Sequence, residues 1–104
     1  MPCNGKQKKI ITMIKTSISH PLRIDEVKAP TGTGIIGMTL CPGKKINSAL
    51  SGVWNRDLDI DLQAIQAWGA RALVNLMEEH EYDLLRVPDY VAKVRSCPME
   101  YFHL

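Results

Sequence analysis

Two short apolar runs open the patterned part of the chain. The pattern of residues 22–27 predicts a first strand that Pro30 ends, and residues 35–40 predict a second strand. Cys41-Pro42-Gly43 ends this second run, because proline has no amide hydrogen for a ladder and glycine permits a sharp reversal. Residues 44–56 are mostly polar and predict a loop.

The clearest periodic segment is a helix predicted over residues 60–68. Its buried stripe consists of side chains that share one face at 100° per residue: Leu58, Leu62 and Ile65, widened by Ala64, Ala67 and Trp68. Asp59 is the expected cap, Asp61 suits the positive first turn, and Gly69 suits the residue just past the last turn.

The C-terminal third predicts a strand, two helical segments and a last strand. Residues 72–77 are almost continuously apolar, which is typical of an interior parallel strand covered on both faces. Helical residues are expected near 82–85 and again after Pro88, and residues 99–104 predict the last strand. A second stripe repeats at helical spacing through Val87, Tyr90, Val91 and Val94. Strands that alternate with helices indicate an α/β fold with a mostly parallel sheet and right-handed crossover helices.

Composition fits one domain with a basic leader. The 104 residues are 45% apolar and 23% charged, which excludes a disordered tail, a collagen-like repeat and a disulfide scaffold. Residues 1–24 hold five basic and no acidic groups, which leaves 8 basic and 11 acidic groups in residues 25–104. We therefore expect residues 1–21 to be a flexible solvated leader and residues 22–104 to be the domain, with no nucleic acid as partner.

The same counts bear on compartment. No uncharged apolar run approaches the roughly 20 residues of a membrane span, and the short apolar stretch near residue 10 is no secretory signal. Three cysteines form an odd and sparse set that fits reduced thiols in a cytoplasm. These features predict a cytoplasmic protein without membrane contact.

Two stretches of the sequence resemble ligand-binding motifs, but the residues that follow each stretch do not fit the motif. Gly32-Thr33-Gly34-Ile35-Ile36-Gly37 matches a dinucleotide fingerprint as a string, but Pro42-Gly43 leaves no room for the helix that must follow it. Asp57, Asp59 and Asp61 imitate half of a calcium loop that lacks its later glycine and glutamate. We expect no cofactor and no metal.

The turn at Cys41 offers one candidate site. Cys41, Lys44 and Lys45 place a thiol beside two cations, which suits an anion-facing loop or an electropositive, reactive thiol. The competing interpretation is a structural Pro-Gly turn, because no residue nearby identifies a partner base.

Several motifs together resemble the dual-specificity phosphatases, in particular the cyclin-dependent-kinase-associated phosphatase group and its bacterial relatives. They run in the family order over residues 22–104: Leu40-Cys41-Pro42-Gly43-Lys44, Arg56-Asp57-Leu58-Asp59-Ile60-Asp61-Leu62, Ile65, Trp68-Gly69-Ala70, Leu73-Val74-Asn75-Leu76, Leu85-Arg86-Val87-Pro88-Asp89 and Tyr101-Phe102-His103-Leu104. The resemblance implies a three-layer α/β phosphatase fold whose cysteine thiolate, in an H-C-x5-R loop, attacks phosphorus.

The chain departs from the family at this catalytic loop. The residues six places after the three cysteines are Lys9, Asn47 and His103, and none of them is arginine. No catalytic residue of the family carries over, so we expect a chain truncated before the phosphate-loop half, without phosphatase activity of its own.

A missing half would leave an apolar sheet edge open at Tyr101, Phe102 and Leu104. The expected partner is a second copy of the chain or the missing C-terminal half-domain. Three hypotheses follow: a truncated and inactive phosphatase-like domain, a self-associating or partner-binding module that uses this edge, and an enzyme of another class built around Cys41.

Overall fold

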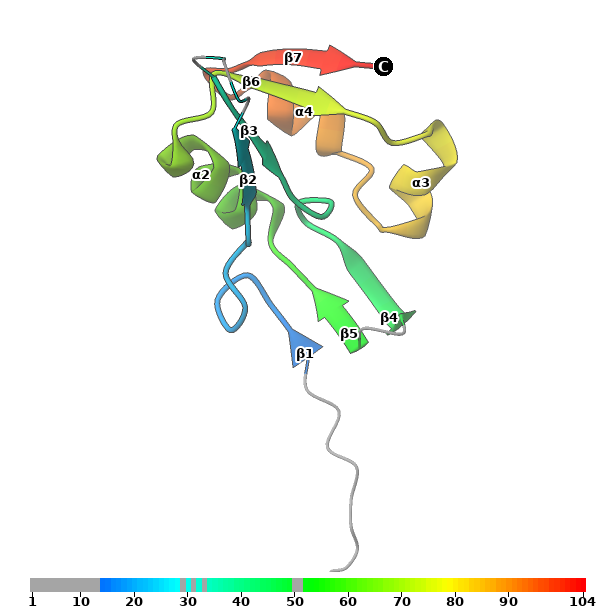
Figure 1. The fold of residues 1–104 in the computed structure, drawn as a ribbon. Coiled ribbons are helices and arrows are strands. Elements are labelled where there is room, and N and C mark those ends of the chain that lie inside the picture. Colours follow the sequence, from blue (N-terminus) through cyan, green and yellow to red (C-terminus); the bar gives the residue numbers. More distant parts are fainter. Residues whose placement is uncertain (1–13, 29, 31, 33, 50–51) are drawn as a thin grey trace, which may run out of the picture.

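The computed structural model describes residues 14–28, 30, 32, 34–49 and 52–104. The described residues form ten elements (Figure 1): β1 Ile14–Lys15, β2 Asp25–Lys28, β3 Ile35–Met38, β4 Lys45–Ala49, β5 Gly52–Asn55, α2 Leu58–Trp68, β6 Ala72–Asn75, α3 Glu79–Leu84, α4 Tyr90–Arg95 and β7 Glu100–His103. The expected mixture of helices and strands is confirmed, and the molecule is a small mixed α/β unit.

The strands form three small sheets, and the expected mostly parallel sheet is wrong for the described residues. β2 and β3 form an antiparallel pair, and β6 and β7 form a parallel pair. In the third sheet β5 lies between β1, to which it is parallel, and β4, to which it is antiparallel. Antiparallel and parallel pairs are therefore equally represented.

The expected loop over residues 44–56 is also wrong, because β4 and β5 pair there. Lys45 lies opposite Asn55 and Ile46 lies opposite Trp54, and the register shifts between Ile46 and Ala49. Asparagine, serine and glycine are common in turns and gave this stretch a loop composition. Ladder hydrogen bonds between the two segments form the strands, and a local sequence pattern does not show such pairing.

Helix α2 begins two residues earlier than expected. The side chain of Asp57, not that of Asp59, accepts the Ile60 amide hydrogen and caps the helix. Leu58, Leu62 and Ile65 are buried as the periodicity predicted. Gly69 adopts the left-handed conformation at φ 104°, which confirms its place as the stop.

The C-terminal elements lie close to their predicted positions. α3 begins three residues before the expected stretch, and α4 begins at Tyr90, two residues after Pro88. β6 and β7 pair with Leu73 opposite Tyr101 and Asn75 opposite His103. However, β6 is covered on one face only, because its residues alternate between exposed and buried.

One apolar core lies between α2, α4 and the inner face of the β6–β7 sheet. Its buried members are Leu58, Leu62, Ile65, Leu73, Val87, Tyr90 and Val94. α4 packs against α2 and β7 and lies behind β6 in Figure 1, so the other face of the β6–β7 sheet is turned toward the viewer. The core therefore covers one face of this sheet.

Part of the expected leader belongs to the fold. Ile14 and Lys15 pair with Val53 and Trp54, and Ser17 is almost fully buried against α2. The described domain thus begins at β1 and not at residue 22, because a polar contact of Ser17 ties this segment to the rest. Residues 1–13 of the expected leader lie outside the described residues.

Candidate functional site

A hydrogen bond to α2 holds the turn that follows β3. The Lys44 amide donates to the Cys41 carbonyl at 3.2 Å, which closes the turn. Gly43 takes a left-handed conformation at φ 77°, and its amide donates to Asp61 Oδ2 at 2.8 Å. The backbone geometry that glycine permits therefore directs an amide at a carboxylate of α2.

Asp61 is the hub of a buried ionic network. Its side chain is fully buried and accepts hydrogen bonds from Arg56 Nε at 2.9 Å and Arg56 Nη2 at 3.0 Å. The Ser17 hydroxyl donates to Asp61 Oδ1 at 2.8 Å, the oxygen that also accepts from Arg56 Nη2. With the bond from Gly43, one carboxylate ties together the segment after β1, the turn after β3 and the end of β5. The Arg56, Ser17 and Gly43 donors occupy both carboxylate oxygens, so the network holds these segments together as a structural clamp.

Lys44 and Lys45 do not converge on Cys41. Lys44 Nζ lies 4.8 Å from the centre of the Trp54 ring, and Lys15 Nζ lies at the same distance from that ring. Lys45 Nζ instead donates to the Gly43 carbonyl at 3.1 Å. A cation held against an aromatic ring or a carbonyl is already stabilised, so each of the two lysines has a contact of its own in this turn.

The Cys41 thiol is held in its neutral form. Burial raises its pKa from 9.0 to about 11; the Lys44 charge lowers the pKa and the Asp61 charge raises it, both less strongly. The Cys41 thiol donates a hydrogen bond to the Pro42 carbonyl oxygen, with 3.4 Å between sulfur and oxygen. A nucleophilic cysteine needs a lowered pKa, so this environment favours the structural turn over the reactive thiol.

We expect slow alkylation of Cys41 in the folded chain. A rise in pKa from 9.0 to about 11 lowers the thiolate fraction at neutral pH about 100-fold. Iodoacetamide labelling followed by peptide mass spectrometry should show Cys41 reacting on the order of 100-fold slower in buffer than in denaturant, with a rate that rises up to about pH 11. Equal or faster labelling of the folded chain would revive the hypothesis of an enzyme built around Cys41.

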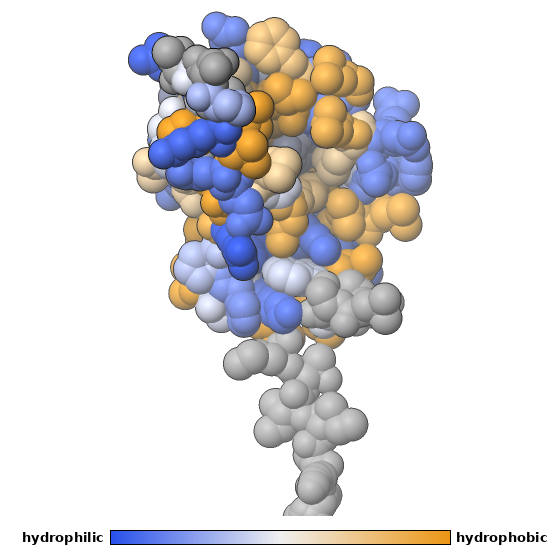
Figure 2. Space-filling view, in the orientation of Figure 1, coloured by the Kyte–Doolittle hydropathy of each residue, from blue (hydrophilic) through white to orange (hydrophobic). Residues whose placement is uncertain are grey.

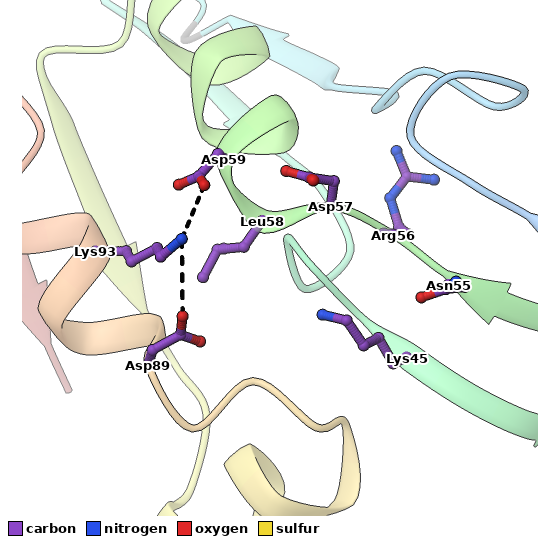
Figure 3. Close-up of a pocket in the computed structure, with 8 residues that line it drawn as sticks. All are labelled: Lys45, Asn55, Arg56, Asp57, Leu58, Asp59, Asp89 and Lys93. Atoms are coloured by element: carbon purple, nitrogen blue, oxygen red, sulfur yellow. Dashed lines mark hydrogen bonds and ion pairs between the residues drawn. The ribbon is translucent and has the colours of Figure 1, made fainter.

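A shallow pocket of about 330 Å³ opens beside this region (Figure 3). Lys93 extends from α4 and donates to Asp59 at 2.8 Å, while Asp89 lies 3.8 Å from the same nitrogen. The hydrogen bond to Asp59 raises the pKa of Lys93. The Arg56 side chain points away from this cluster in Figure 3. Acids balance the cations that line the pocket, which makes it a poor receptor for a phosphate group.

A second polar network lies where β6 and β7 end. Asn75 Nδ2 donates to the hydroxyl oxygens of Tyr82 at 2.7 Å and Tyr101 at 2.9 Å. Asn75 Oδ1 accepts the Met77 amide, and His103 Nε2 donates to the Met77 carbonyl at 2.7 Å. Tyr101, expected on the open edge, therefore lies half-buried on the helix side of its strand.

The outward face of the sheets is apolar. On β2–β3 the Glu26 carboxylate accepts from Trp68 of α2, and a β-carbon at Gly37 would lie 3.0 Å from the same ring. The alternate positions on these strands point away from α2. We call this outward surface, together with the outward surface of the separate β6–β7 sheet, the open face. It consists of Val27, Ile36, Met38, Val74, Leu76, Phe102 and Leu104, which are between 46% and 83% exposed.

Figure 2 shows apolar side chains gathered over β6 and β7 in the upper part of the view. Phe102 and Leu104, two of the three residues expected at an exposed edge, belong to this surface, and both are exposed. The exposed area is a face of the sheet rather than an edge alone, because Val74 and Leu76 of the neighbouring strand share it.

No protein-family model, curated protein or solved structure matches the chain. The likeness to dual-specificity phosphatases thus rests on the sequence motifs. Among the residues that the structure describes, no helix is long and apolar enough to span a membrane. Within the same residues, no cluster of three or more His, Cys, Asp or Glu side chains is arranged to hold a metal ion.

The two buried networks were missed at the sequence level. Asp61 was assigned only to the first turn of a helix, where a solvent-exposed carboxylate is ordinary. Its five-residue separation from Arg56 gives no pairing signal of the kind that i,i+4 spacing gives on a helix. Asn75 lies in an otherwise apolar run. A polar side chain in a buried strand must be hydrogen-bonded, so its position was a sign that it has a partner inside the protein.

Proposed function

We propose that this chain is a phosphatase-like α/β unit, equivalent to the N-terminal half of a dual-specificity phosphatase domain. It hydrolyses no phosphoester by itself and acts by binding through the open face. The proposal joins the sequence resemblance with the hypothesis of a self-associating or partner-binding module.

The open face is the observation that carries this proposal. A sheet that faces water normally presents polar residues outward and apolar residues inward. Here Val74 and Phe102 point outward, while Asn75 and Tyr101 point inward and form hydrogen bonds. Burying such a surface against a partner gains about 25 cal/mol per Å², which offsets the entropy that association costs.

The chemistry of the turn supports the absence of activity. The sequence holds no Cys-x5-Arg loop, since Lys9, Asn47 and His103 occupy the arginine position after each cysteine. The Cys41 thiol has a raised pKa, and its neighbouring lysines are directed at Trp54 and at a carbonyl. Without a thiolate and an arginine, the attack on phosphorus and the stabilisation of its oxygens lack their groups.

A phosphatase assay tests this proposal. The purified chain should release p-nitrophenol from p-nitrophenyl phosphate at the rate of the buffer, and a Cys41→Ser variant should behave identically. Turnover by the wild-type chain that Cys41→Ser abolishes would overturn the proposal. The same assay with a separately produced C-terminal half of a phosphatase-like domain extends the test, because restored turnover would identify that half as the partner.

A further inference from the structure

We propose that a second copy of this chain covers the open face, so that two copies pack sheet against sheet about a two-fold axis. This inference rests on the binding role proposed above and names the partner. Each copy would contribute the same surface, as in an isologous dimer interface.

On the exposed strands the polar side chains point toward the helices and the apolar side chains point toward solvent, which is the reverse of an ordinary solvent-facing sheet. Asn75, Tyr101 and His103 lie on the helix side, where their polar atoms are bonded to Tyr82, Asn75 and Met77. The intervening residues Val74 and Phe102 face away from the helices and are 53% and 48% exposed. β2–β3 repeats this arrangement, with Glu26 bonded to α2 and Val27 facing outward. Two separate sheets thus present apolar outward faces.

The size of the open face suits a dimer. With the ordinary surface areas of such residues, its seven members together expose roughly 800 Å², backbone included, which is about what each partner of a stable complex buries. The largest apolar patch of a typical monomer is about 300–600 Å². The seven residues together exceed this value and match one complete interface, and they are divided between the β2–β3 sheet and the β6–β7 sheet.

Shape and charge favour a second sheet as the occupant. Two sheets pack face to face at about 10 Å with their apolar side chains interdigitated, which matches a surface made of strand residues. Among the outward positions on these strands, Asp25 is bound by Arg23 at 2.8 Å, and Glu100 is the other carboxylate. A strongly charged partner would find few complementary groups there, whereas a copy of the same apolar face complements it.

Sedimentation velocity and size-exclusion light scattering of the full chain test this inference. At tens of micromolar the wild-type chain should have twice the 11.7 kDa mass of one copy. Val74→Lys and Ile36→Lys place a charge on each of the two sheets, and each should raise the dimer dissociation constant on the order of 30-fold. Leu84→Glu on α3 is the matched control, because Leu84 is 63% exposed but lies outside the open face.

The possible outcomes distinguish the second copy from other partners and from failure of the proposed function. A dimer that both lysine variants dissociate, with wild-type circular dichroism, and that Leu84→Glu leaves intact supports the inference. A wild-type monomer, or a dimer equally stable in both lysine variants, overturns it. A monomer that forms a one-to-one complex only with a C-terminal phosphatase-like half also overturns the second copy as occupant but leaves the proposed binding role standing. Cysteine-dependent turnover would instead overturn the proposed function, whatever the oligomeric state.

Discussion

Replacing Asp61 by alanine is expected to lower the free energy of unfolding by about 3–5 kcal/mol, because the substitution leaves the buried Arg56 guanidinium without its counter-charge. Arg56 is almost fully buried, and two of its nitrogens bond to Asp61. The Gly43 amide loses its acceptor at the same time, and the Ser17 hydroxyl loses the closer of its two acceptors, which leaves it the Asp57 carbonyl. Urea denaturation followed by circular dichroism measures the loss, which is a large share of the stability of a domain this size.

A carboxylate on the same helix is the matched control for Asp61. Asp59 is exposed and forms an ion pair with Lys93, so Asp59→Ala should cost at most about 1 kcal/mol. Ser17→Ala removes one donor to the buried carboxylate and should cost an intermediate amount, which gives a measurable value even if Asp61→Ala does not fold. Equal losses for Asp59→Ala and Asp61→Ala would contradict the clamp.

Gly43→Ala is expected to destabilise the fold by about 3 kcal/mol. The backbone at Gly43 has φ 77°, where a side chain costs about 1–2 kcal/mol. The added β-carbon would also lie 2.8 Å from Leu58 Cβ and 3.1 Å from Val87 Cγ1, and both of these residues belong to the core. Relief of this overlap would shift the turn away from α2 and adds about 1–3 kcal/mol.

Gly69→Ala separates the two contributions to that cost. Gly69 has a left-handed backbone at φ 104°, yet no atom lies within 4 Å of an added β-carbon. Its replacement should therefore cost the backbone term alone, about 1–2 kcal/mol. Thermal unfolding of the two variants should rank Gly43→Ala as the less stable; the reverse order would show that the turn does not press against Leu58 and Val87.

The sequence predicted those elements whose signals are local. Helix α2 was expected from the spacing of Leu58, Leu62 and Ile65, and Gly69 was recognised as its stop. The cap was misplaced by two residues, because Asp57 and Asp59 are chemically equivalent candidates, and only backbone geometry distinguishes them. β6 and β7 were expected as strands, and their parallel pairing is confirmed.

The pattern of apolar and polar residues did not predict which segments contact one another. The β4–β5 pair looked like a loop, since cross-strand hydrogen bonds leave no trace in local composition. Lys44 and Lys45 are neighbours in sequence, but one lies against Trp54 and the other bonds to Gly43. Adjacency along the chain therefore did not show what each ammonium group contacts, because contacts are made in space and not along the sequence.

The sequence by itself determined where the helices and the last two strands lie, because repeats of 3.6 and 2 residues are local properties of the backbone. Only the tertiary structure decided which side of each strand faces the helices. Alternation along β7 separates Tyr101 from Phe102 but does not say which of them is buried. The packing of α4 and the hydroxyl bond to Asn75 turn Tyr101 inward and leave Phe102 on the open face. The burial of Asp61 was settled in the same way, since a carboxylate can leave water only where distant residues supply the donors that replace it.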